Sequence, residues 1–99
     1  MANVRLDLNQ PEFQQELFDL EKSQQRAVLN TLQKISSMIW DQVYRDRGLK
    51  WEAVSSGVGP GGRRLYTVRC GKGFRIVAYR EGDFFVPLSI HPDHDSAYR

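Results

Sequence analysis

Six basic side chains gather in one stretch of the sequence, and two histidines and a tyrosine follow them. The basic residues are Arg63, Arg64, Arg69, Lys72, Arg75 and Arg80, and the later residues are His91, His94 and Tyr98. A guanidinium keeps its charge at any physiological pH, and its planar fork can bond two phosphate oxygens at once. A histidine, with an unperturbed pKa near ~6.5, can give or take a proton at neutral pH. Together these residue types favour a site that holds a phosphate and moves protons.

The charge of the chain is unevenly distributed. Residues 1–48 carry 6 Lys and Arg against 7 Asp and Glu, residues 49–82 carry 7 against 2, and residues 83–99 carry 1 against 3. A formal net charge of +2 therefore contains a segment of +5, which is 7 minus 2. Charge concentrated on one segment creates a local field that attracts phosphates, so we expect a polyanion such as a nucleic acid as the main partner.

Length and composition predict one globular domain over residues 1–99, large enough to bury a core of its own. No stretch approaches the ~20 apolar residues of a membrane span, and the first residues lack the apolar centre of a signal peptide. We therefore expect a cytoplasmic protein with no membrane partner. The one cysteine, Cys70, cannot form an internal disulfide, and we expect a small packed strand residue there rather than a reactive thiol.

Apolar spacing predicts a short strand followed by two helices. Val4, Leu6 and Leu8 alternate with polar residues, as in a half-buried strand. Pro11 suits the first position of a helix, which Asn9 or Gln10 can cap. A second, long helix is predicted from an N-cap at Ser23 to about residue 46, because an apolar stripe recurs every three or four residues at Val28, Leu32, Ile35, Ile39 and Val43, and Gly48 would end it. The two helices should form an antiparallel hairpin that covers a sheet.

From residue 49 the apolar period changes to two. Strands are predicted at 50–54, 64–70, 74–80 and 84–90, with a flexible glycine-rich loop at 55–62 and hairpins at 71–73 and 81–83. The glycine-rich loop lacks the Lys-Ser or Lys-Thr and the helix that would make it a phosphate-binding loop. Pro87 cannot donate to a strand ladder, so we expect it at a bulge. The expected fold is α+β, with the N-terminal strand and the helical hairpin on one face of a twisted antiparallel sheet and the other face open.

Strand alternation then indicates which side chains share the open face. If Ile76 and Ala78 point to the helices, Arg75, Val77 and Tyr79 point away. In the last strand Phe84, Val86, Leu88 and Ile90 should share one face and Phe85, Ser89 and His91 the other. Arg69 and Arg75 flank one hairpin, so both guanidiniums could meet one phosphate; the alternative is ordinary ion pairs with Glu52 or Glu81.

A metal site could use His91, His94 and an aspartate. The spacing on a non-helical segment and the lack of further histidines and cysteines argue against it. We expect no metal, no cofactor and no small-molecule ligand.

The chain resembles the RelE/ParE toxin superfamily of bacterial toxin–antitoxin systems over nearly its whole length. The resemblance rests on the order of a strand, two helices and a meander, and on local motifs: Leu-Lys-Trp-Glu at 49–52, Leu-Tyr-Thr-Val-Arg at 65–69, Gly-Phe-Arg-Ile-Val-Ala-Tyr at 73–79 and His-Asp-Ser-Ala-Tyr at 94–98. The hairpin with an arginine on each side is the more specific part. Where RelE itself has an arginine shortly before its C-terminal tyrosine, this chain has Pro92, flanked by His91 and His94; other ribosome-dependent members use histidine in this region.

The resemblance implies a metal-independent, ribosome-dependent endoribonuclease that cleaves mRNA. It implies catalytic roles for Arg69, Arg75, His91, His94 and Tyr98, in which the arginines bind the scissile phosphate, a histidine transfers a proton and the tyrosine orients a nucleotide. Lys50, Arg63, Arg64 and Lys72 would add contacts to RNA. The implied partners are the ribosome with its mRNA and a cognate antitoxin, whose covering segment should be acidic because the toxin face is basic.

Two other functions remain open on the same scaffold. A ParE-like protein would inhibit DNA gyrase without catalysis, and purified protein would then block supercoiling. An inactive accessory domain that binds RNA or protein would cause neither growth arrest nor RNA cleavage.

Overall fold

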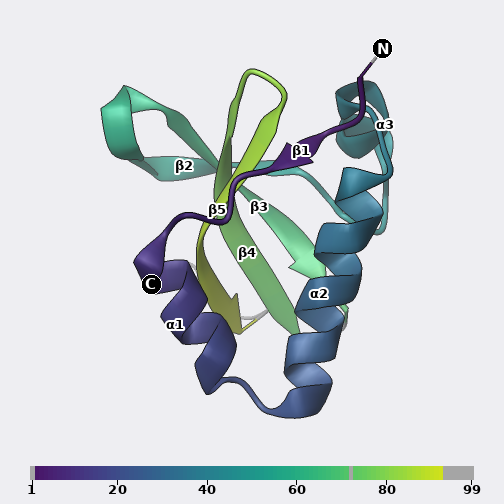
Figure 1. The fold of residues 1–99 in the computed structure, drawn as a ribbon. Coiled ribbons are helices and arrows are strands. Elements are labelled where there is room, and N and C mark those ends of the chain that lie inside the picture. The colour runs from purple at the N-terminus through teal and green to yellow at the C-terminus, as the bar shows by residue number, and fades with distance from the viewer. Residues whose placement is uncertain (1, 72, 93–99) are drawn as a thin grey trace.

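The structure is a computed structural model that describes residues 2–71 and 73–92. Within this range three helices lie on one face of a five-stranded sheet (Figure 1). The helices are α1 (Pro11–Asp19), α2 (Lys22–Ser36) and α3 (Trp40–Arg45), and the strands are β1 (Arg5–Leu6), β2 (Glu52–Val58), β3 (Arg64–Cys70), β4 (Phe74–Glu81) and β5 (Phe84–Pro92). The α+β class with helices on one face is therefore confirmed.

The sheet has the order β1-β5-β4-β3-β2, and it is mixed rather than purely antiparallel. The last four strands form the predicted antiparallel meander, but β1 pairs in parallel with the start of β5, Arg5 opposite Phe84 and Leu6 opposite Phe85. The prediction of an all-antiparallel sheet is wrong at this edge. Alternation of apolar residues reports that a strand is half-buried, but it does not report the direction of its neighbour.

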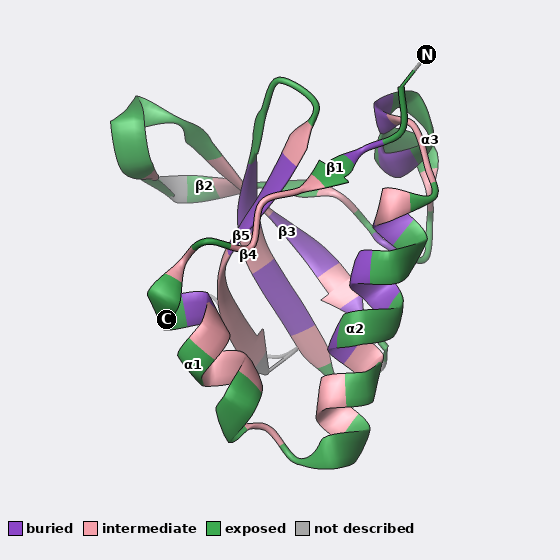
Figure 2. Cartoon of the chain, viewed as in Figure 1, coloured by how far each residue is buried: buried purple, intermediate pink, exposed green. Residues whose placement is uncertain are grey.

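The core lies between the sheet and the three helices, where the facing sides of the helices and of β3 and β4 are buried (Figure 2). Residues of all three helices take part, together with residues of four strands or strand ends: Phe13, Val28, Leu32, Ile35, Trp40 and Val43 from the helices, and Val4, Val68, Cys70, Ile76, Ala78 and Phe85 from the sheet side. Burying one such side chain stabilises the fold by about 1.5–3 kcal/mol. The helix face of the sheet, as we call this side, is therefore fixed by packing.

The predicted long second helix is two helices in the structure. Helix α2 ends at Ser36; the hydroxyls of Ser36 and Ser37 donate to the carbonyls of Gln33 and Lys34 at 2.8 and 2.7 Å. The Val4 N–H then donates to the Met38 carbonyl at 2.7 Å, whereas in a continuing helix this carbonyl would accept from an N–H of the helix itself. The break aims Trp40 into the core, where it is 5% exposed.

The strand bounds match the prediction best in the centre of the sheet. Strand β3 has the predicted bounds, and β4 and β5 are one and two residues longer. The glycine-rich segment was predicted as a loop, but β2 runs through it to Val58, which pairs with Arg64 after a register shift beyond Ala53. That part of the prediction is wrong, because backbone pairing with β3 outweighs the low strand preference of glycine.

A bulge in β5 decides which of its residues face away from the helices. Val77 pairs with Ser89 but Ala78 pairs with Pro87, so Leu88 is an extra residue and Pro87 lies beside a bulge, as predicted. The bulge reverses the alternation. Phe85 belongs to the core and Val86 lies opposite Tyr79, contrary to the prediction, whereas Ser89 and His91 lie on the face away from the helices, as predicted.

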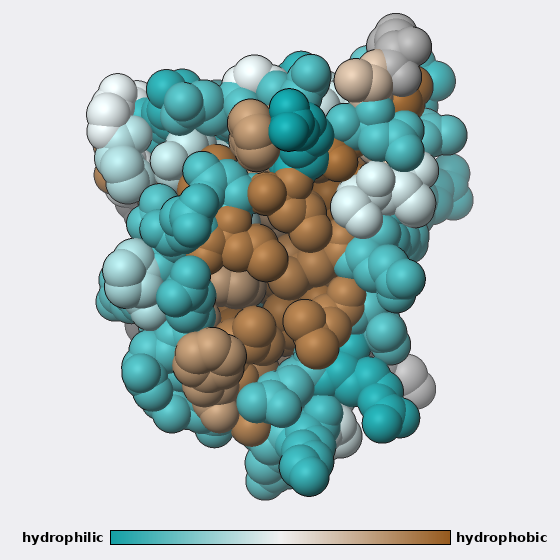
Figure 3. All heavy atoms as spheres, viewed as in Figure 1, coloured by the Kyte–Doolittle hydropathy of each residue, from teal (hydrophilic) through white to brown (hydrophobic). Residues whose placement is uncertain are grey.

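Helices α1 and α2 diverge from their short connection, and apolar side chains gather between them (Figures 1 and 3). The partly buried apolar residues of this region that pack on the core include Leu6, Leu8, Leu17 and Leu20. We call this region the interhelical apolar surface. Among the described residues, no helix is long and apolar enough to cross a membrane.

Candidate functional site

Arg69, Arg75 and His91 form a row across three adjacent strands. Arg69 of β3 lies directly opposite Arg75 of β4, and Arg75 lies directly opposite His91 of β5. Directly paired residues project from the same face of a sheet with Cβ atoms about 4.5–5.5 Å apart. The face is the one away from the helices, because Ile76 and Cys70, which alternate with these residues, are in the core. We call this face the outer face and the three residues the outer-face row.

Local sequence explains why the row forms. Gly71 has φ +59, a conformation that glycine adopts without strain, and it lets the chain reverse immediately after β3. The reversal brings Arg69 opposite Arg75. The bulge beside Pro87 then sets the alternation of β5 so that His91 continues the row.

Arg75 is the most constrained member of the row. It is 4% exposed, its Nη1 donates to Thr67 Oγ1 at 3.1 Å, and the same nitrogen lies 3.6 Å from Glu52 Oε1. Thr67 and Glu52 are themselves paired across β3 and β2, so a polar connection runs from the edge of the sheet to β4. The prediction that Arg75 points away from the helices is confirmed. The surface is not open at Arg75, however. The ion pair with Glu52, which the sequence left as the alternative, is present at 3.6 Å.

His91 is held by a neighbouring side chain. Its Nε2 and Ser89 Oγ are 2.8 Å apart, and the donor depends on the tautomer of the ring. Both residues face outward on β5, and His91 is half-buried. Within the described residues the ring's other nitrogen, Nδ1, makes no hydrogen bond. An imidazole fixed through one nitrogen presents the other in a set direction, which suits a group that transfers protons.

Of the other predicted site residues, the three that the structure describes do not join this row: Lys50, Arg63 and Arg64. Lys50 is exposed just before β2 and has φ 51. Arg63 pairs with Glu81 at 2.9 Å and lies over the Tyr79 ring. Arg64 alternates with Leu65 and shares the helix face with Tyr66 and Val68, so it lies on the opposite side of the sheet from the row. Lys72, His94 and Tyr98 lie outside the described residues.

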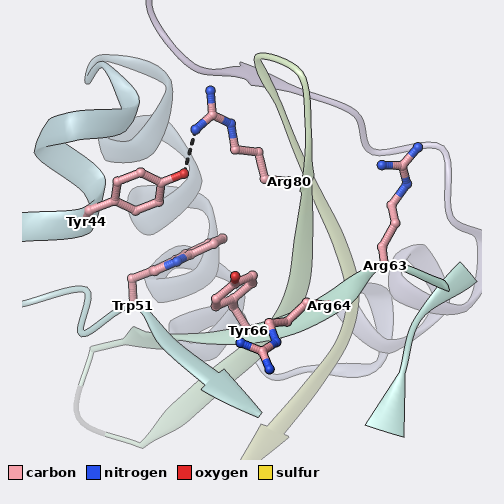
Figure 4. A pocket seen from close by; sticks show the side chains of 6 residues that line it. All are labelled: Tyr44, Trp51, Arg63, Arg64, Tyr66 and Arg80. Carbon is pink, nitrogen blue, oxygen red and sulfur yellow. Dashed lines mark hydrogen bonds between the residues drawn. The ribbon is translucent and has the colours of Figure 1, made fainter. Parts of the chain in front are cut away.

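A second group of side chains was not recognised in the sequence. Tyr44, Trp51, Arg63, Arg64, Tyr66 and Arg80 line a hollow of ≈ 240 Å³ beside α3 (Figure 4). The rings of Trp51 and Tyr66 stack at 4.4 Å with 19° between their planes, and Arg80 donates to the Tyr44 hydroxyl. We call this hollow the aromatic pocket. The alternation of Arg64 with Tyr66 was a signal for it, but Tyr44 and Trp51 approach only in the folded chain.

Cys70 is the packed strand residue that the sequence predicted. It is fully buried in the core cluster, and burial raises the pKa of its thiol to about 11, although a hydrogen bond with Thr31 acts in the opposite direction. A thiol with so high a pKa carries almost no thiolate at neutral pH. Cys70 is therefore no candidate for a nucleophile.

Comparison of the chain with protein-family models, with curated proteins and with solved structures finds no match.

Proposed function

We propose that this protein is the toxin of a bacterial toxin–antitoxin pair, a cytoplasmic endoribonuclease that cleaves mRNA on the ribosome without a metal ion. The observation that carries the proposal is the outer-face row, in which two guanidiniums and an imidazole occupy directly paired positions on adjacent strands. This is the set of groups that RNA cleavage through the 2′-hydroxyl requires: cations for the phosphate and a titratable ring for a proton.

The cleavage reaction forms one bond to phosphorus, breaks another and needs two proton transfers. The 2′-hydroxyl oxygen attacks the adjacent phosphorus while a base takes its proton, and the bond to the 5′-oxygen breaks as that oxygen receives a proton. The products are a 2′,3′-cyclic phosphate and a 5′-hydroxyl end. His91 carries one of the two proton transfers in this proposal. The resemblance to RelE-type toxins leaves His94 as the alternative to His91 for proton transfer, and it implies that Tyr98 orients a nucleotide.

The two arginines stabilise the charge that develops on the phosphate. Arg75 suits this role because a hydrogen bond to Thr67 already holds its guanidinium in place, so folding rather than the reaction orders the side chain. Loss of one such contact raises a reaction barrier by about 2.7–4 kcal/mol, by analogy with oxyanion donors. Arg69 stands beside Arg75 in the row and would bind the same phosphate.

A toxin of this kind needs a protein partner that silences it. The interhelical apolar surface is a candidate binding surface for this partner (Figure 3). A contiguous apolar region on the surface of a small domain is typical of a site that binds another protein. The basic segment of residues 49–82 favours acidic residues on the antitoxin.

The test uses Arg69→Ala and His91→Asn, with Arg26→Ala as the matched control. Arg26 is exposed on α2, away from the outer face, so its loss changes the net charge alone. Cells expressing wild type or the control should stop growing and show cuts in ribosome-bound messages, whereas Arg69→Ala should reduce cutting about 100-fold or more. Growth arrest with intact messages would rule out the nuclease.

One observation favours a second candidate, a ParE-like gyrase inhibitor without catalysis. Arg75 is 4% exposed and engaged with Glu52, as an arginine with a purely structural role would be. Inhibition of DNA supercoiling by purified protein, undiminished in Arg69→Ala, would select this function over the nuclease.

A further inference from the structure

We propose that the aromatic pocket binds one unpaired nucleotide of an RNA strand, with the base against the rings and the phosphate on the arginines. The inference rests on the proposed function in assuming that RNA is the natural ligand, but it concerns a different face of the molecule. Arg64 and Tyr66 share the helix face with Val68, whereas the outer-face row lies on the other side of the same sheet.

The rings form a partly exposed aromatic platform. Trp51 and Tyr66 stack at 4.4 Å, and Tyr44 stands 5.9 Å from Trp51 at 53°, so the rings line the hollow from two sides (Figure 4). Tyr44 is 45% exposed, and Trp51 and Tyr66 are half-buried. A base can stack on such a ring whatever its identity, because every base has a π-face.

Packing holds this platform in place. Trp40, which is buried, meets Trp51 edge-on at 5.3 Å, and its indole N–H donates to the Asp83 carbonyl at 3.2 Å. Trp51 also lies 6.4 Å from Phe85 of the core. A base that stacks here therefore orders few side chains, which favours binding.

The cations beside the rings have no acidic partner in the described part of the chain. Arg80 donates to the Gly82 carbonyl at 2.7 Å and to the Tyr44 hydroxyl, and its guanidinium lies 4.7 Å from the centre of the Trp40 ring. Arg64 is exposed and makes neither an ion pair nor a hydrogen bond there. By contrast Arg63, at the margin of the hollow, is neutralised by Glu81. Two guanidiniums whose charge is not offset by a carboxylate attract a phosphate.

The size and composition of the hollow restrict the kinds of ligand that it can bind. Its ≈ 240 Å³ is smaller than the roughly 300–1,000 Å³ of pockets for drug-sized molecules, so it fits one ring system. Within residues 2–71 and 73–92 no acidic residue lines it, which favours an anion. An acidic peptide would use the arginines but would leave the ring faces unused, whereas a nucleotide uses both.

The binding test is independent of cleavage because it uses a 2′-O-methyl pentanucleotide, which lacks the attacking hydroxyl. We follow the two indole N–H resonances of the protein during titration, assigned with Trp51→Phe. The Trp51 signal should move with saturation, and more than that of Trp40. Arg64→Gln should weaken binding at least about threefold and lower the salt dependence by about one phosphate contact, a slope change near 0.7. The matched control Arg26→Gln should change neither.

The outcomes separate the two proposals. Equal affinities for Arg64→Gln and Arg26→Gln, or no movement of the Trp51 signal, would overturn the pocket and leave the nuclease proposal standing. Movement of Trp51 in a protein that cleaves no message would support the pocket while the nuclease fails. If AMP bound as tightly as the pentanucleotide, the pocket would belong to a free nucleotide, and the assignment to an RNA strand would be wrong.

Discussion

Replacing Glu52 by glutamine tests whether Arg75 serves a phosphate or only the fold. Glu52 Oε1 is 3.6 Å from Arg75 Nη1, and the Glu52 side chain is 49% exposed while Arg75 is 4% exposed. At this distance the Coulomb attraction is about 1 kcal/mol at the dielectric constant of water and about 5 kcal/mol at an effective constant of 20. Because solvent reaches Glu52, we expect the attraction between Glu52 and Arg75 to be near the lower value, about 1 kcal/mol.

A phosphate that binds Arg75 must compete with this carboxylate. Glu52→Gln keeps the shape of the side chain and removes the competition, so we expect message cleavage to accelerate by up to about fivefold, the equivalent of 1 kcal/mol. The free energy of unfolding should fall by about 1 kcal/mol or less, because Arg75 keeps its hydrogen bond to Thr67. Single-turnover cleavage of ribosome-bound message and urea denaturation measure the two effects.

The matched control is Glu81→Gln, which makes the same charge change beside Arg63 at 2.9 Å. Its effect on cleavage should stay below about twofold, because Arg63 is not part of the outer-face row. Equal acceleration in both variants would assign the effect to net charge. Cleavage slowed about tenfold by Glu52→Gln at unchanged stability would show that Glu52 itself takes part in the reaction, and the reasoning about Arg75 would be refuted.

Two further predictions concern Ser89 and Cys70. Ser89→Ala should lower cleavage about tenfold, because His91 loses the hydrogen bond that holds its ring, and Ser89→Thr should restore the rate; a Ser89→Ala cleavage rate equal to that of wild type would contradict this. Burial raises the pKa of the Cys70 thiol from 9.0 to about 11, so between these values the folded protein keeps a proton that the unfolded chain releases, and stability must fall as pH rises. Relative to Cys70→Val, wild type should lose about 2 kcal/mol between pH 8 and pH 10.5 in urea denaturation, and parallel curves for the two proteins would contradict the burial argument.

The centre of the sheet could be predicted because its alternation carries two signals at once. In β3, Val68 and Cys70 are apolar while Thr67 and Arg69 are polar, and only one strand register satisfies both faces. The short glycine-bearing turn then leaves one way to pair β3 with β4. The approach of Arg69 to Arg75 followed from those two facts alone.

The helix break and the parallel edge strand depend on contacts between distant parts of the chain. Ile35 and Val43 keep helical spacing across the break because both still pack on the same sheet. In the break between α2 and α3, the Met38 carbonyl accepts a hydrogen bond from the N–H of Val4, a residue distant in the sequence. No pattern local to residues 36–39 records that contact, so periodicity predicted one helix.

The candidate sites were predictable to different degrees for the same reason. Pairing within hairpins placed the outer-face row, but the burial of Arg75 requires Glu52 and Thr67 from two other positions in the sheet. The aromatic pocket draws Tyr44 from α3, Arg80 from β4 and Trp51 from the turn before β2. Arg64 and Tyr66 of β3 complete the pocket, and their alternation is the one local signal for it; no single window of sequence contains the whole set.

The alternation of strands also explains why one basic segment produces two surfaces. Arg64 and Arg69 lie on the same strand at positions of opposite parity, so their side chains leave opposite faces of β3. A ligand that neutralises both must reach around the edge of the sheet, which a flexible single strand of RNA can do and a rigid duplex cannot. An inhibitor that covers only the outer face would then stop cleavage while the aromatic pocket still binds RNA, so loss of activity and loss of RNA binding should be separable in the inhibited protein.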